Sequence, residues 1–158
     1  MHYLIIFFIS MVPLIELRGA IPYAIGFIQA GTQLSLPLCY VIAILGNMLP
    51  VPFIFFFARK VLEWGMDKPL IGKFFTFCLE KGHKGGEKLQ NTAGKGLYFA
   101  LFLFVGIPLP GTGAWTGTLA ASILDMDFKK SCVAVVSGVV LAGIIMGVLS
   151  AGIFSVVL

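Results

Sequence analysis

Two stretches of the chain are apolar without interruption and are long enough to cross a lipid bilayer. Leu34–Ala58 and Val133–Leu158 contain no charged residue, and a spanning helix needs about 20 apolar residues. Pro50 and Pro52 are expected to kink or break the end of the first stretch, because proline removes a backbone donor and clashes with the preceding turn. In the second, small residues recur every four positions, which predicts close packing within the chain. They are Ala134, Gly138 and Ala142 on one face, and Gly143, Gly147 and Ala151 on the neighbouring face.

Two further apolar stretches are interrupted in the middle. Tyr3–Ala30 contains Glu16, Arg18, Gly19 and Pro22, and Leu97–Leu124 contains the run Pro108-Leu-Pro-Gly-Thr-Gly113. Each half is about 12 residues, or about 18 Å of helix, which is too short for a hydrocarbon core of about 30 Å. Each stretch is therefore either a broken spanning helix or a re-entrant hairpin that enters the bilayer and returns on the same side. The shortness of the halves favours re-entrance.

Most of the charge lies in the middle of the chain. Arg59–Lys95 holds eight basic and four acidic residues, and an excess of Lys and Arg predicts a cytoplasmic segment. This segment divides the chain into a first half, residues 1–58, and a second half, residues 96–158, each with an interrupted stretch followed by a span. An odd number of crossings in the first half would make the halves an inverted repeat, as in many transporters.

Part of this basic segment has helical periodicity. The apolar residues of Leu70–Leu79 fall on one side of a helical wheel. They predict either a helix lying in the membrane interface or an ordinary amphipathic connector. The run Gly82-His-Lys-Gly-Gly86 is expected to end it.

Composition excludes a water-soluble domain. Hydrophobic residues make up 59% of the chain and charged residues 11%, and the mean hydropathy is +1.02. We therefore expect one all-α domain, multi-pass in the cell membrane and surrounded by membrane lipids. The three cysteines are far apart and the two histidines form no ligand motif, so no metal, cofactor or enzymatic activity is expected. We expect no nucleic-acid partner, and the sequence leaves homo-oligomerisation open.

The first interruption carries the only charges of its apolar stretch. Ionisable residues at membrane depth are expensive and are candidates for function, although a shallow hairpin would leave Glu16 and Arg18 near the headgroups instead. Burial favours the protonated form of a carboxyl group, so Glu16 is a candidate proton carrier. Arg18 offers a planar fork of donors suited to phosphate. A direct Glu16–Arg18 pair is not expected in a helix, since positions two apart do not face each other.

The second interruption suggests a binding loop, and the alternative is a plain interhelical turn. Thr112 suits the N-cap of a returning helix, and Trp115 either anchors at the interface or packs beside the site. Returning helices are expected to begin near Arg18–Gly19 and near Thr112–Gly113, and in an inverted repeat both positive ends converge. This predicts one anion site with three kinds of member. Arg18, Gly111, Thr112 and Gly113 contact the ligand, Pro22, Pro108 and Pro110 hold the breaks open, and Glu16 and Gly19 complete the site.

The two interruptions resemble a known family. Glu16-Leu-Arg-Gly-Ala-Ile-Pro22 and Pro108-Leu-Pro-Gly-Thr-Gly-Ala-Trp-Thr-Gly117 are similar to the signature stretches of the putative small multi-drug export protein family, which is grouped with the DedA-like superfamily and its SNARE-associated Golgi proteins. The resemblance implies two re-entrant hairpins in inverted repeats. It also implies transport of polyprenyl-phosphate carriers or phospholipids, whereas the family's name implies drug efflux. Leu103–Pro108 lacks the arginine of the DedA-type Phe-x-Arg-Phe-x-Pro motif.

Three functions compete at this stage. The first is a transporter or flippase for an anionic amphiphile such as a polyprenyl phosphate or a phospholipid, with proton coupling through Glu16. The second is an exporter of small drug molecules. The third is an assembly factor without transport, which would have no evident need for the charges at the first interruption.

Overall fold

The structure is a computed structural model that describes residues 1–74, 76–77, 80, 84, 87, 96–124 and 126–157. The elements of these parts are helices. In the first half they are α1 (His2–Met11), α2 (Glu16–Gln29), α3 (Leu36–Met48), α4 (Val51–Phe53), the π-helix η1 (Ile54–Ala58) and α5 (Arg59–Met66). In the second half they are α7 (Leu97–Gly106), α8 (Ala114–Ile123) and α9 (Phe128–Val157).

Among the described residues, two segments are long and apolar enough to cross a membrane. They are Leu36–Phe57, which joins α3, α4 and η1, and Phe128–Ile153 of α9. The expected interruption at Pro50 and Pro52 is present, because α3 ends at Met48 and a π-helix follows α4. Helix α9 starts before the predicted Val133, because the carboxylate of Asp127 accepts the Lys130 N–H at 2.9 Å and caps its first turn.

The two interrupted stretches fold as hairpins of short helices. Helices α1 and α2 form one hairpin and α7 and α8 the other, and each is followed by a long helical segment. The first break lies at 12–15, earlier than predicted, so Glu16, Arg18, Gly19 and Pro22 all belong to α2. Pro13 explains this position, because the residue before a proline is driven out of the helical region and Val12 is extended. Pro22 is tolerated inside α2, as proline often is in membrane helices.

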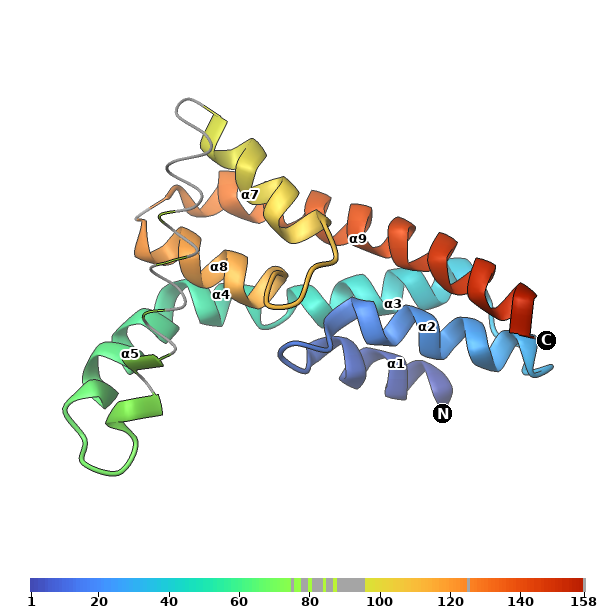
Figure 1. Cartoon of the computed structure of the whole chain (residues 1–158), viewed down its shortest axis with the longest axis horizontal. Coiled ribbons are helices and arrows are strands. Elements are labelled where there is room, and N and C mark those ends of the chain that lie inside the picture. Colours follow the sequence, from blue (N-terminus) through green and yellow to red (C-terminus); the bar gives the residue numbers. More distant parts are fainter. Residues whose placement is uncertain are drawn as a thin grey trace.

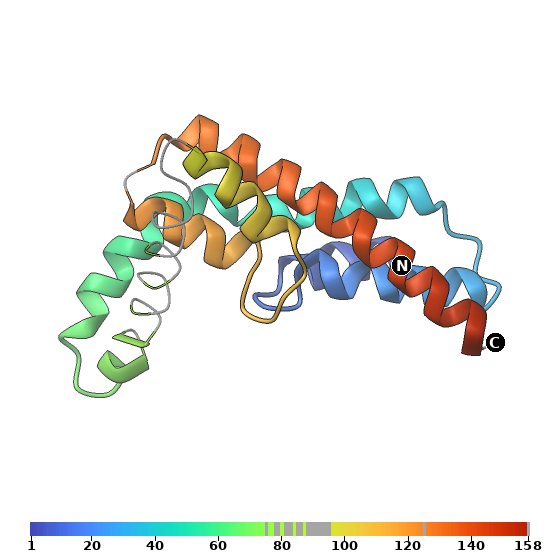
Figure 2. The same ribbon diagram turned by 45° about the horizontal axis from the view of Figure 1, so that its top comes forward.

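The tips of the two hairpins meet near the middle of the molecule (Figure 1). The α1–α2 hairpin comes from the end that holds both chain termini, and the α7–α8 hairpin comes from the end that holds α5. Helices α3 and α9 run in opposite directions past the tips, and the rotated view agrees (Figure 2). Both chain ends therefore lie toward one end of the molecule, and the start of the basic segment lies at the other.

Small residues on α9 allow neighbouring helices to approach closely, as predicted. A Cβ added at Gly138 would lie 2.7 Å from the Cβ of Val105 and 2.8 Å from the carbonyl oxygen of Phe102, both on α7. On the neighbouring face, a Cβ at Gly147 would overlap the hydroxyl group of Tyr40 on α3. The stripe therefore serves packing within the chain, and only its end differs, since Ala151 is exposed.

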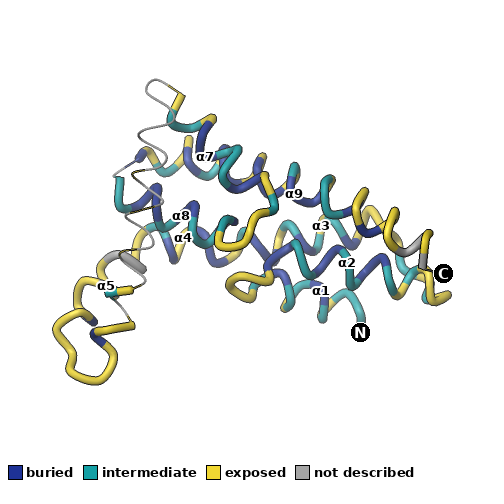
Figure 3. The backbone as a smooth tube through the Cα atoms, viewed as in Figure 1, coloured by how far each residue is buried: buried dark blue, intermediate teal, exposed yellow. Residues whose placement is uncertain are grey.

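Apolar side chains cover much of the outside of the bundle as well as its inside. The inner faces of the helices are buried and the outer faces of the long segments are exposed (Figure 3), yet the exposed side chains include Phe53, Phe57 and Val148. A soluble protein of this size does not leave such a continuous apolar surface in water. This exposure supports a place in the membrane for the bundle.

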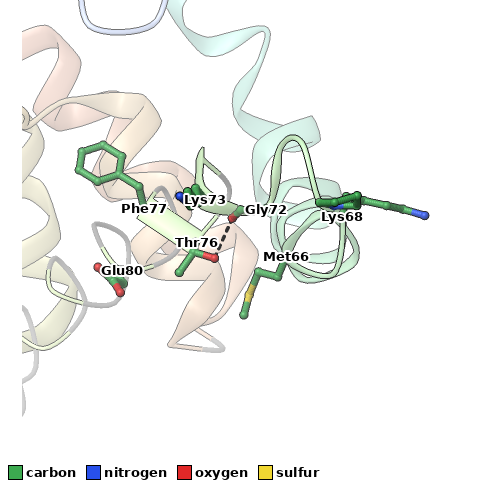
Figure 4. Close-up of a pocket in the computed structure, with 8 residues that line it drawn as sticks. Met66, Lys68, Gly72, Lys73, Thr76, Phe77 and Glu80 are labelled. Carbon is green, nitrogen blue, oxygen red and sulfur yellow. Dashed lines mark hydrogen bonds between the residues drawn. The ribbon is translucent and has the colours of Figure 1, made fainter.

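The basic segment is described only in part. Positions 75, 78 and 79 of the predicted periodic stretch Leu70–Leu79 lie outside the described residues, as do four of the five residues of the Gly82–Gly86 run. The described residues around Gly72, Lys73, Thr76 and Phe77 line an open cavity of about 420 Å³ (Figure 4). The hydroxyl group of Thr76 donates to the carbonyl oxygen of Gly72 across one helical turn at 2.7 Å.

Candidate functional site

The candidate site is the place where the two hairpin tips meet, which we call the junction. It is made by the start of α2, beside the break at 12–15, and by the break at 107–113 with the first turn of α8. The sequence predicts that both breaks contribute to one site. The structure brings four of the predicted residues together there: Glu16, Arg18, Thr112 and Gly113.

Glu16 caps a helix of the other hairpin. Its carboxylate oxygens accept hydrogen bonds from the backbone N–H groups of Ala114 and Trp115, at 3.1 Å each. The first N–H groups of a helix have no partner inside it and carry the positive end of the helix dipole. Because Glu16 is only 4% exposed, the carboxylate and the start of α8 satisfy each other away from solvent.

Two unusual backbone conformations make this contact geometrically feasible. Glu16 itself has φ +51°, and Gly113 has φ +140°. A non-glycine residue in the left-handed region is strained by roughly 1–2 kcal/mol, which the two hydrogen bonds offset. A Cβ at Gly113 would lie 2.5 and 2.7 Å from the two carboxylate oxygens of Glu16. Position 113 therefore requires glycine both for its backbone angle and for the space that Glu16 fills.

Arg18 binds the opposite side of the second break. Its Nη1 donates to the carbonyl oxygen of Leu109 at 2.8 Å, and its Nη2 donates to the hydroxyl oxygen of Thr112 at 2.8 Å. Two longer hydrogen bonds, 3.3 and 3.4 Å, join Nη2 to the carbonyl oxygens of Val105 and Ile107. These carbonyls are at the end of α7, where the helix dipole is negative and a cation is stabilised.

Thr112 closes its own loop and does not cap α8. Its hydroxyl oxygen lies 2.9 Å from the carbonyl oxygens of both Ile107 and Leu109, and it accepts the Leu109 N–H at 3.3 Å. The N-cap position of α8 is Gly113, which has no side chain to offer. The predicted cap at Thr112 is therefore wrong. Glu16 supplies the cap from a distant part of the chain, because the tight loop directs Thr112 back toward α7.

The two charges of the first hairpin match the two helix ends of the second. Glu16 meets the positive start of α8, and Arg18 meets the negative end of α7. Both residues start from the first turn of α2, so one turn of helix stabilises both sides of the other break. As predicted, they do not form a direct hydrogen-bonded pair among the contacts that hold the junction. These hydrogen bonds, which Glu16 and Arg18 make across the junction, can hold the two hairpin tips together, and we call them the lock.

The other predicted site residues surround this lock. Gly19 lies on α2 next to Ile15, whose side chain fills the space of a missing Cβ, and Pro22 lies one turn farther along α2. Pro108 is partly buried, whereas Pro110 and Gly111 are exposed at the loop tip. Gly111 has φ +80°, and a Cβ there would meet open space. Pro108, Pro110 and Gly111 therefore lie in the second break, whereas the prediction that Pro22 holds the first break open is wrong, because Pro22 lies inside α2.

Sequence reasoning missed several polar groups of the interior. The carbonyl oxygens that receive Arg18 could not be foreseen, since every residue carries one. Asn47 on α3 and Thr118 on α8 are each 1% exposed, and neither Asn47 Oδ1 nor Thr118 Oγ1 has a hydrogen-bond partner among the described residues. The sequence could have identified Asn47, because it is a polar amide inside an otherwise apolar span. Unpaired buried polar atoms are uncommon in native proteins.

Chemistry at a metal ion has no support in the described part of the chain, where no three His, Cys, Asp or Glu side chains lie close enough to hold one.

Comparison with protein families gives a match that covers the junction. The family model of the putative small multi-drug export protein matches residues 16–145, most of the chain and both sides of the junction. No curated protein and no solved structure matches the chain.

Proposed function

Because the chain belongs to the putative small multi-drug export protein family, we propose that it is a membrane exporter whose gate is the junction of the two hairpin tips. One observation carries the proposal. Glu16 binds the start of α8, and Arg18 binds the end of α7 and the loop after it, so the tips are joined by interactions that can be released together. A gate of this kind needs two stable arrangements, and this structure is the closed one.

We further propose that both hairpins are re-entrant in the bilayer. The arms have 10, 14, 10 and 10 residues, and a helix of about 20 residues is needed to cross. In this arrangement the basic segment is cytoplasmic by its charge, and both termini lie outside. The repeated order of hairpin and long helix, with α3 and α9 antiparallel (Figure 1), fits an inverted repeat of the kind found in transporters.

The charges of the junction bear on the cargo. When the tips separate, Arg18 loses its partners at the end of α7, and the start of α8 loses the carboxylate of Glu16. Both exposed groups then attract an anion, one as a guanidinium fork and one as a helix N-terminus. We therefore propose an anionic amphiphile as cargo, such as a polyprenyl phosphate or a phospholipid.

Proton coupling is a separate part of the proposal. Glu16 is the buried carboxylate of the junction, and in the closed state its charge faces two N–H groups. A proton taken up by Glu16 weakens that cap and favours opening, since a neutral carboxyl group accepts hydrogen bonds less strongly. Glu16→Gln removes the titration and keeps the shape. Transport by this variant that keeps its pH dependence would exclude Glu16 as the carrier.

Two alternatives rest on the same residues. Export of small cationic drugs agrees with the name of the family, and Glu16 would attract the cation. An assembly factor without transport also fits, because the described hydrogen bonds of Glu16 and Arg18 are internal and give both charges a structural role. The presence of these charges alone therefore does not exclude a scaffold.

Proteoliposome assays separate the three functions. Purified protein is reconstituted and supplied in turn with a fluorescent polyprenyl phosphate, a fluorescent anionic phospholipid and a cationic dye. We expect protein-dependent movement of the anionic amphiphiles, and slower movement with Arg18→Gln. Transport of the dye alone would support drug export. No transport of any probe by folded protein would contradict the exporter and favour the assembly factor.

A further inference from the structure

A groove lies on the outside of the bundle between α7 and α9, away from the junction. Its volume is about 630 Å³, within the range of small-molecule sites. Tyr98, Phe99 and Phe102 line it from the start of α7, and Lys129, Lys130 and Val133 line it from the start of α9. This part of α7 and α9 lies at the same end of the molecule as α5 (Figure 1).

The groove has a cationic end and an apolar body. Lys129 and Lys130 are both exposed and form the cationic end. The body is formed by Phe99, which is 64% exposed, by Val133, which is 67% exposed, and by Phe102. One elongated occupant with a negative end and a hydrocarbon tail would therefore match both parts.

Tyr98 holds the cationic end in place. The Nζ atom of Lys130 lies over the ring of Tyr98, 5.7 Å from its centroid, as in a cation–π contact. The hydroxyl oxygen of Tyr98 accepts the backbone N–H of Asp127 at 3.2 Å, which ties α7 to the start of α9. The acidic side chain nearest in sequence, Asp127, is used as the cap of α9. Both lysine side chains are exposed, so an external anion can reach their ammonium groups.

The position along α9 places the two ends of the groove at different depths. The apolar segment of α9 that could cross a membrane begins at Phe128, so Lys129 and Lys130 lie where the hydrocarbon starts. Val133 follows about one turn later, roughly 5 Å deeper at 1.5 Å per residue. Lysines at this level extend toward the headgroups and attract anionic lipid.

We propose that this groove binds one anionic phospholipid, with its phosphate on Lys129 and Lys130 and an acyl chain along Phe99, Phe102 and Val133. This site is separate from the junction and does not depend on the identity of the cargo. Charge complementarity selects the anionic headgroup, and the apolar body selects a lipid over a free phosphate. The bound lipid fixes α7 against α9 at the cytoplasmic end.

The experiment measures lipid binding directly. Purified protein in detergent is titrated with phosphatidylglycerol or with phosphatidylcholine, and bound lipid is counted by native mass spectrometry. We expect phosphatidylglycerol to bind preferentially and the variant Lys129→Gln/Lys130→Gln to bind it about tenfold more weakly. Inorganic phosphate at equal concentration should not compete.

A matched control distinguishes the groove from overall charge. Lys60→Gln/Lys68→Gln removes the same charge from α5 and its end, where Lys68 also lies over an aromatic ring, 4.6 Å from the centroid of Trp64. This control should bind phosphatidylglycerol within about twofold of the unmodified protein. The charge-preserving Lys129→Arg/Lys130→Arg should retain binding, which guards against a folding defect. Equal losses in both glutamine variants, or equal binding of the two lipids, would overturn the proposal.

Discussion

The carboxylate of Glu16 accepts the backbone N–H of Ala114 at 3.1 Å, across 98 positions of the sequence. Through this contact the first hairpin supplies a hydrogen-bond partner that the start of α8 in the second hairpin needs. Helix α8 has no cap from its own loop, since Gly113 precedes it, so its start depends on a residue of α2. The two halves of the chain are therefore expected to fold and open as one cooperative unit.

Removing the carboxylate should destabilise the whole bundle. Glu16→Ala leaves two buried N–H groups without partners, and we expect a loss of about 2–4 kcal/mol of unfolding free energy. Glu16→Gln retains one acceptor oxygen and should lose about half as much. Chemical unfolding in a mild detergent measures both. If the two variants unfold alike at the unmodified protein's midpoint, the cap does not contribute to stability.

The two glycines of the second break should differ in tolerance. Both have positive φ, so alanine is strained at each by roughly 1–3 kcal/mol, and the strain is greater at Gly113, whose φ of +140° and ψ of −173° are adopted almost only by glycine. At Gly113 the added Cβ also meets the carboxylate of Glu16, whereas at Gly111 it meets open space. Gly113→Ala should therefore be the more damaging by at least about 1 kcal/mol, measured as the difference in unfolding free energy. Gly111→Ala is the control for adding a Cβ at a positive φ in the same break without a contact to Glu16.

Arg18 should protect the second break from local opening. Without its guanidinium, the carbonyl oxygens of Leu109 and Ile107 lose a charged donor. In Arg18→Gln we expect amide hydrogen exchange in 107–113 to become about tenfold faster, because one charge-assisted hydrogen bond contributes roughly 1.5 kcal/mol. Arg18→Lys should restore only part of the protection, since an ammonium lacks the planar fork. Unchanged exchange in both variants would contradict the lock.

Helix α9 supplies a test of close packing within one element. Gly138→Val places atoms against Val105 and the Phe102 carbonyl group, where a Cβ alone is already too close. We expect a loss of about 3 kcal/mol or more, since backbone atoms cannot move aside. Gly152→Val is the control, because a Cβ there meets open space, and it should cost less than about 1 kcal/mol. Thermal unfolding midpoints compare the two.

Reporter fusions test the orientation. Re-entrant hairpins with a cytoplasmic basic segment predict that a reporter after Leu158 is active only outside the cytoplasm. A reporter inserted at 85–86 in the basic segment should show the opposite activity. Cytoplasmic activity at both sites would mean that the second interrupted stretch crosses the bilayer, because α7, α8 and α9 are the described helices between the two reporters.

Hydropathy and charge in the sequence were sufficient to predict that the protein is a membrane protein and to locate its two long apolar segments. Transfer of apolar side chains from water depends on local composition, so Leu34–Ala58 and the span in Val133–Leu158 could be recognised without any partner. The two breaks were also visible, since proline, glycine and charge interrupt apolar stretches locally. Their boundaries were less certain, and the first break came to lie at 12–15 because Pro13 and the positive φ of Leu14 end α1 there.

Only the tertiary structure decided which groups bind each other. The sequence marked Glu16, Arg18 and Thr112 as candidates and assigned the cap of α8 to Thr112. In the folded chain Glu16 supplies that cap, and Arg18 donates to the carbonyl oxygen of Leu109 in the break and to those of Val105 and Ile107 at the end of α7. A backbone N–H or carbonyl group is present at every residue and has no letter in the sequence. Its availability depends on where a helix ends in space and on which distant side chain the packing brings to that end.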